Sequence, residues 1–65
     1  MSVDPLVHVI SAAYRLTGDL QRAEFLVRHE PLAAFEGKTA ELLVQEGRAA
    51  TVIDYLKSLE SGASG

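Results

Sequence analysis

The stretch Pro31-Leu32-Ala33-Ala34-Phe35-Glu36-Gly37-Lys38-Thr39 divides this 65-residue sequence into two parts of similar design. Pro31 ends a helix, because the residue before a proline is pushed away from helical dihedral angles. Thr39 begins a helix, because its hydroxyl can accept a hydrogen bond from a free amide of the first turn. Between these residues we expect a compact connector with apolar anchors that can contain one helical turn.

The part before this connector has the signals of two helices separated by one glycine. Asp4-Pro5 is typical of a helix start, and Gly18 can end that helix in the left-handed conformation. Asp19 is the expected N-cap of the next helix, in which Glu24 and Arg28 are predicted to pair. Apolar residues at spacings of three and four predict the buried faces. These are Leu6, Val9, Ile10, Ala13 and Leu16 in the first helix, and Leu20, Ala23, Val27 and either Phe25 or Leu26 in the second.

The part after the connector repeats the helix–glycine–helix design. One helix runs from Thr39 to Gly47, and the last runs from Arg48 to about Leu59 or Glu60. The predicted core positions are Leu42, Leu43 and, with less regular spacing, Val44 in the shorter helix, and Ala49, Val52, Ile53, Leu56 and Leu59 in the longer one. Asp54 and Lys57 are predicted to pair on the outer side of the last helix. Residues 61–65 are small and polar, which is typical of a flexible tail.

No segment alternates apolar and polar residues over a useful length, so strands are not expected. The sequence therefore predicts an all-α fold, a small four-helix domain of two short αα-hairpins that covers residues 1–60. The 48% hydrophobic content is too high for a disordered chain. A domain of this size without a disulfide or a metal often completes its core with another protein, and we expect a homodimer.

The charge pattern and the N-terminus favour a protein that acts in the cytoplasm. Six Lys and Arg residues stand against nine Asp and Glu residues, and the basic ones are scattered along the sequence. Nucleic-acid binding by this chain alone is disfavoured, because such domains usually have a basic stripe. Residues 1–5 lack the positive charge of a signal peptide, and no apolar run approaches the ~18 residues that span a membrane.

Residues that could perform catalysis or hold a metal lack the necessary spacing. His8 and His29 fall on different predicted helices, and the sequence has no cysteine for a thiol nucleophile or a zinc site. The serines lack the rigid turn that presents a nucleophile. Gly37-Lys38-Thr39 matches the end of a phosphate-binding loop, but Leu32 occupies the place of its first glycine. We therefore expect neither an enzyme nor a cofactor.

The aromatic residues fall into two groups. Phe25 and Phe35 are predicted to lie in the core. Tyr14 and Tyr55 each have a charged neighbour, and two interpretations remain open for them. They are either half-exposed contacts with another protein or core rings with the hydroxyl at the surface.

Three stretches occur in an order that is similar to a known family. They are residues 23–26 (Ala-Glu-Phe-Leu), residues 31–43 (the connector and a Leu-Leu helix) and residues 46–56, followed by Leu59-Glu60-Ser61-Gly62. Together they resemble the toxin-binding domain of the Xre/MbcA/ParS antitoxins. Phe25, Glu36 and Ala40 differ from the Trp, Gly and Pro that are usual in this family. Its usual N-terminal helix–turn–helix domain has no counterpart in this sequence.

The resemblance implies a protein that binds and neutralises a RES-domain toxin, an enzyme that consumes NAD⁺, by covering its active site. In such pairs the C-terminal end of the antitoxin covers the entrance to that active site. Carried to this sequence, the partner-binding residues are Tyr55, Leu59, Glu60, Ser61 and Gly62, with Gly37, Lys38 and Thr39 at the turn. Two alternatives remain open. One is a stand-alone, phage-encoded inhibitor of a host regulatory protein, and the other is a small dimeric DNA-binding regulator.

Overall fold

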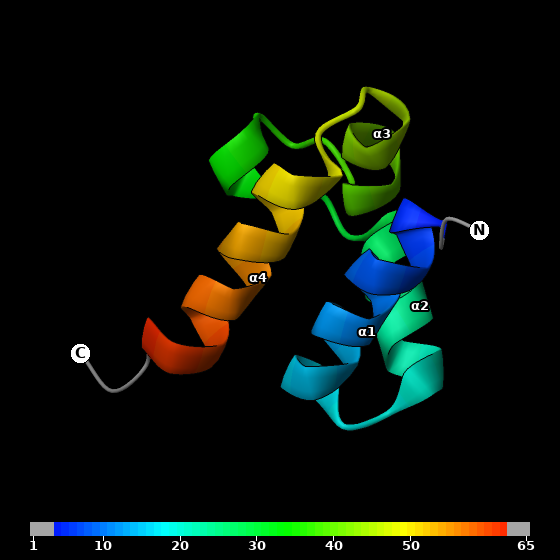
Figure 1. The fold of residues 1–65 in the computed structure, drawn as a ribbon, viewed down its shortest axis with the longest axis vertical. Coiled ribbons are helices and arrows are strands. Elements are labelled where there is room, and N and C mark those ends of the chain that lie inside the picture. The colour runs from blue at the N-terminus through cyan, green and yellow to red at the C-terminus, as the bar shows by residue number, and fades with distance from the viewer. Residues whose placement is uncertain (1–3, 63–65) are drawn as a thin grey trace.

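The structure, a computed structural model, describes residues 4–62 and is all-α, as the sequence predicts. The helices in this range are α1 (Pro5–Thr17), α2 (Leu20–His29), the short 3-10 helix η1 (Ala33–Phe35), α3 (Ala40–Gln45) and α4 (Ala49–Gly62). They form a small four-helix domain, in which η1 is the helical turn expected in the connector (Figure 1). None of the helices in the described range is both long and apolar enough to cross a membrane.

The starts of three helices are fixed by the predicted N-cap side chains. Asp4, Asp19 and Thr39 each accept a hydrogen bond from a backbone amide of the following turn. The donors are Leu6 for Asp4 (2.9 Å), Gln21 for Asp19 (2.8 Å) and Leu42 for Thr39 (3.2 Å). Each bond satisfies an amide that has no partner within the helix, so these local signals determine where the helices begin.

The helix ends also follow local signals, with one difference at the C-terminal end. Gly18 and Gly47 adopt the left-handed conformation, with φ of 73° and 81°, and α2 ends at His29, shortly before Pro31. However, α4 continues to Gly62, past the end that we predicted near Leu59 or Glu60. Ser61 and Gly62, which we assigned to the tail, are therefore helical, and residues 63–65 lie outside the described residues.

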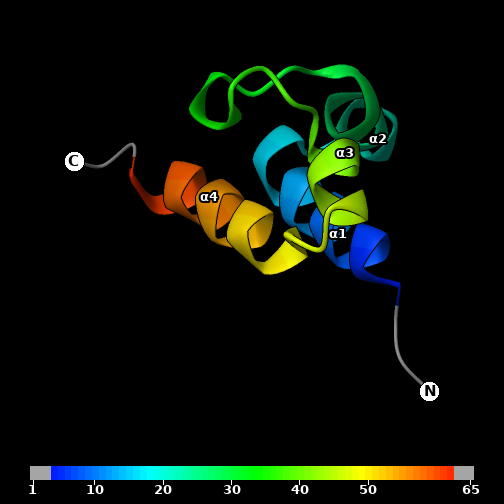
Figure 2. The same ribbon diagram turned by 90° about the horizontal axis from the view of Figure 1, so that it is seen from above.

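The helices pack around α1 (Figures 1 and 2). α1 and α2 form an antiparallel hairpin, and α4 lies on the other side of α1. The short α3 contacts α1, α2 and α4. The connector closes on itself, because the Leu32 amide donates to the Lys38 carbonyl (3.0 Å), and η1 lies beside the first turns of α4. The two helix–glycine–helix units therefore share one core.

That core contains small and branched apolar side chains from every α-helix and from the connector. Its buried members are Val9, Ala13, Ala23, Val27, Leu32, Ala40, Leu43, Val52 and Leu56. Half-buried residues, among them Leu6, Ile10, Leu16 and Ile53, pack around them. The predicted inner faces of the first and last helices are therefore largely confirmed.

Four side chains that we predicted to face inward are exposed instead. Their exposed fractions lie between 40% and 62%, and they are Leu20, Phe25, Leu42 and Leu59. Phe25 lies about 200° around α2 from the buried Ala23, so it cannot share the same inner face. Leu26, the alternative to Phe25, is half-buried against the core. Leu59 is on the last turns of α4, where this helix diverges from α1 (Figure 1).

The charged side chains do not make the two helical pairs that we predicted. Within residues 4–62, neither Glu24–Arg28 nor Asp54–Lys57 forms an ion pair. Arg28 turns to α3 instead, where its Nη1 atom lies 3.3 Å from Glu41 Oε2. This contact joins two helices, but pairs of such exposed groups contribute at most about 1 kcal/mol.

Candidate partner-binding surfaces

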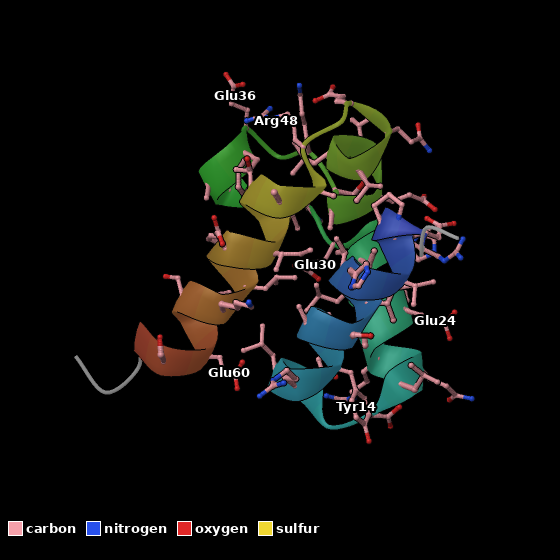
Figure 3. The ribbon with its side chains drawn as sticks, in the orientation of Figure 1. Tyr14, Glu24, Glu30, Glu36, Arg48 and Glu60 are labelled. Atoms are coloured by element: carbon pink, nitrogen blue, oxygen red, sulfur yellow. The ribbon has the colours of Figure 1, made fainter. Side chains whose placement is uncertain are left out.

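The three turn residues that the resemblance assigns to partner binding have structural roles in the connector. Gly37 adopts a left-handed conformation (φ 81°), and Glu36 before it does the same (φ 61°). Lys38 Nζ lies 3.0 Å from Glu46 Oε2, and Thr39 is the N-cap of α3. These interactions fix the shape of the turn, and the side chain of Glu36 points away from the domain into solvent (Figure 3).

An aromatic contact holds the connector against α4. The rings of Phe35 and Tyr55 meet edge to face, with 5.3 Å between their centroids. The guanidinium carbon of Arg48 lies 5.6 Å from the centroid of Phe35. Both rings are half-buried against the core rather than fully enclosed. Tyr55 therefore has a packing role, and Phe35 lies at the margin of the core in which we placed it.

The other predicted residues lie at the opposite end of α4. Leu59 is exposed, Glu60 Oε1 lies 3.4 Å from Arg15 Nε, and the Ser61 hydroxyl donates to a backbone carbonyl of the preceding turn. Gly62 is the last residue of the helix. A helix of 14 residues is about 20 Å long, so this end lies far from the turn (Figure 3). The structure therefore does not bring the two predicted groups together into one site.

An apolar groove lies between α1 and α2. This groove, which we call the α1–α2 groove, has a volume of about 330 Å³. Its lining residues are Val7, Ile10, Ser11, Tyr14, Leu20 and Glu24. Val7, Tyr14 and Leu20 are 48–56% exposed, so a large part of each apolar side chain contacts solvent at the same place.

The α1–α2 groove was missed at the sequence level, although α1 carries a signal for it. Val7, Ile10 and Tyr14 follow one another at spacings of three and four, and they form a second apolar stripe beside the core stripe. Leu20 was assigned to the core, although it lies at the edge of the α2 inner face. Of the two interpretations of Tyr14, the structure matches the half-exposed side chain.

A second groove lies on the other side of α1, against α4. It is smaller, about 190 Å³, and is lined by His8, Ser11, Ala12, Arg15, Ile53 and Lys57. Three of these side chains are basic, and Ser11 lines both this groove and the α1–α2 groove. The two grooves therefore lie on the two sides of the exposed surface of α1.

A third and wider hollow surrounds the exposed Phe25, whose ring lies 5.0 Å from that of His29. Its lining mixes basic and acidic side chains, with Arg22, Asp19 and Glu30 among them. In the part of the chain that the structure describes, no three His, Cys, Asp or Glu side chains are grouped to hold a metal.

Comparisons with models of protein families, with curated proteins and with solved structures found no match. The fold class, a small all-α domain of four helices, is therefore what is established for this chain. The assignment of a partner depends on the surfaces described above and on the sequence resemblance.

Proposed function

We propose that this chain is a cytoplasmic, non-enzymatic protein-interaction module that binds and inhibits a partner protein. The observation that supports this proposal is the exposure of Val7, Tyr14 and Leu20 around one groove. Single exposed apolar residues are normal on protein surfaces, whereas clusters of them mark sites of interaction. Tyrosine is also among the residues enriched where proteins meet.

The partner that we propose is a RES-type toxin that consumes NAD⁺, with the chain acting as its antitoxin by covering the active site. This part of the proposal comes from the resemblance of residues 23–26, 31–43, 46–56 and 59–62. It is compatible with the last turns of α4, where the side chain of Leu59 is exposed and does not pack in the core of the domain. The α1–α2 groove and this end of α4 are then two separate regions for contact with the partner.

The experiment is co-expression of the chain with the product of the adjacent gene, followed by pull-down and measurement of cellular NAD⁺. We expect a stable complex and NAD⁺ levels that are preserved only when the chain is present. Absence of a complex together with unprotected NAD⁺ would contradict the antitoxin role. A complex with a partner that does not consume NAD⁺ would instead support an inhibitor of a different protein.

A pair of variants tests the α4 end specifically. Leu59→Lys places a charge on the exposed apolar side chain, and Ser58→Lys places the same charge on the neighbouring exposed residue. Neither residue belongs to the buried core, so both variants should fold. We expect Leu59→Lys to lose protection of NAD⁺ and Ser58→Lys to keep it, and equal protection by both would remove α4 from the contact.

The homodimer that the sequence leads us to expect is a separate proposal. It is supported by large apolar side chains that remain exposed outside the α1–α2 groove and the end of α4, namely Phe25 and Leu42. Sedimentation equilibrium of the purified chain at micromolar concentration measures it directly. We expect the mass of two chains, and the mass of one chain at all concentrations would contradict the proposal.

A further inference from the structure

The exposed surface of α1 is apolar on one flank and basic on the other. The flank toward α2 carries Val7 and Tyr14, and the flank toward α4 carries His8 and Arg15, with Ser11 between them. Lys57 of α4 extends the basic flank. Any molecule that fills the α1–α2 groove and is wider than the groove therefore meets positive charge along one edge.

The charges of this basic flank are only partly compensated within the chain. The side chain of Arg15 is 69% exposed, and its single ion pair, with Glu60, is long at 3.4 Å. Lys57 forms no ion pair with any other residue in the range 4–62. The opposite wall of the α1–α2 groove carries the carboxylate of Glu24, so the two sides of the groove differ in sign.

The spacing of the apolar side chains suits a helical ligand. Val7 and Tyr14 are seven residues apart on α1, which corresponds to about 10 Å or two helical turns. An amphipathic helix repeats its apolar side chains over the same distance and can place them along such a groove. The residues beside the apolar face of the ligand helix then lie next to the two sides of the groove. The charges on these sides determine which ligand sequences bind.

We propose that the α1–α2 groove binds an amphipathic helix of a partner protein, with a row of carboxylates on the edge that faces Arg15 and Lys57. This inference rests on the proposed function and names the chemistry of the partner. The apolar face of the partner helix covers Val7, Tyr14 and Leu20. The acidic edge compensates the basic flank, while the edge near Glu24 is neutral or basic.

The test uses two hydrocarbon-stapled model peptides that are helical on their own. Both carry leucines at spacings of three and four along one face. One peptide has glutamates along one edge, and the other has lysines at the same positions. Fluorescence polarisation with the full chain measures both affinities at low and high salt. We expect the acidic peptide to bind about 5-fold tighter or more, with a difference that shrinks at high salt.

Two variants assign this binding to the proposed surface. Leu20→Lys should weaken the acidic peptide about 10-fold or more, whereas Gln21→Lys, on another face of α2, should leave its affinity unchanged. The double variant Arg15→Glu, Lys57→Glu should reverse the preference between the two peptides. Circular dichroism of each variant verifies that the helical fold is retained.

Several outcomes would overturn the inference. They are no binding of either peptide, equal binding of both, or a preference that the double variant does not change. Dimerisation of the chain that Leu20→Lys abolishes would show that a second copy occupies the groove. A toxin complex that is insensitive to all these variants would overturn this inference alone and leave the proposed function standing. Selective peptide binding without any toxin complex would overturn the proposed antitoxin function and leave the groove as a binding site for an acidic amphipathic helix.

Discussion

Replacing Leu43 with alanine is expected to destabilise the domain much more than the same replacement at the adjacent Leu42. Both residues are leucines of the short helix α3, and the sequence predicts that both face the core. The structure separates them, because Leu43 is 0% exposed and Leu42 is 40% exposed. Both variants remove the same atoms from a leucine side chain. The difference between their free energies of unfolding therefore measures the effect of burial.

The size of the difference follows from the environment of each side chain. Truncating a fully buried leucine to alanine removes its burial and leaves a cavity, which costs about 2–5 kcal/mol. Leu42 already keeps much of its surface in water, so its truncation should cost only about 1 kcal/mol. A domain of 65 residues has a total stability of about 3–10 kcal/mol. Leu43→Ala therefore removes a large share of the stability, and Leu42→Ala removes a small one.

Urea unfolding followed by far-UV circular dichroism measures both variants, because the helices provide the signal. With a urea m-value of about 1 kcal/mol/M for so small a domain, Leu42→Ala should lower the midpoint by about 1 M. Leu43→Ala should lower it by about 2 M or more, or leave the chain unfolded in water. Equal losses for the two variants would refute the assignment of Leu43 to the core and Leu42 to the surface.

Three further predictions concern local interactions, and urea unfolding measures each of them. Glu36→Gly should raise the free energy of unfolding by about 1 kcal/mol, because glycine adopts the left-handed conformation without a steric penalty. The matched change Glu30→Gly, where φ is −83°, should lower it. Asp19→Ala should lower stability by about 1 kcal/mol and speed amide exchange in the first turn of α2, because the N-cap is lost. Glu60→Gln should change stability by less than about 0.5 kcal/mol, because its pair with Arg15 is exposed.

Contrary results would have definite meanings. A loss of stability in Glu36→Gly would show that the Glu36 side chain contributes more than its backbone conformation costs. Unchanged exchange in Asp19→Ala would show that α2 does not depend on its N-cap. A loss of more than about 1 kcal/mol in Glu60→Gln would show that the Arg15 pair is stronger than exposed pairs usually are.

The helix boundaries could be predicted because the signals for them are local. Asp4, Asp19 and Thr39 satisfy amides two or three residues away, and Gly18 and Gly47 supply the conformation that ends a helix. None of these interactions depends on how the helices pack. The end of α4 was less predictable, because the helix continues through Ser61 and Gly62, residue types that usually end one.

The burial of residues at the edges of the helix faces could not be predicted in the same way. Leu20 and Leu42 lie beside buried positions, and only the direction of the neighbouring helices decides whether such residues are covered. Phe25 shows a further difficulty, because its size favours the core while its position on α2 places it outside. Hydrophobicity and spacing identify the centre of a buried face but not its width.

The candidate site could be predicted even less well, because its residues come together only in the tertiary structure. The α1–α2 groove combines residues from two helices. Of the residues that the resemblance assigns to binding, Gly37, Lys38 and Thr39 lie in the connector, whereas Leu59 to Gly62 form the last turn of α4. A turn such as Gly37-Lys38-Thr39 has the same sequence whether it binds a partner or holds the connector in shape. The contacts of Lys38 and Thr39 hold the connector in shape, and partner binding by this turn stays a prediction.

The most direct test of the central claim is a calorimetric titration of a purified RES-type toxin, the partner that we propose, with three forms of the chain. These are the unchanged chain, Leu20→Lys in the α1–α2 groove and Gln21→Lys on another face of α2. We predict equal affinities for the unchanged chain and Gln21→Lys, and an affinity about 10-fold lower or worse for Leu20→Lys. No binding by the unchanged chain, or equal binding by all three forms, would contradict a partner-binding role for this groove.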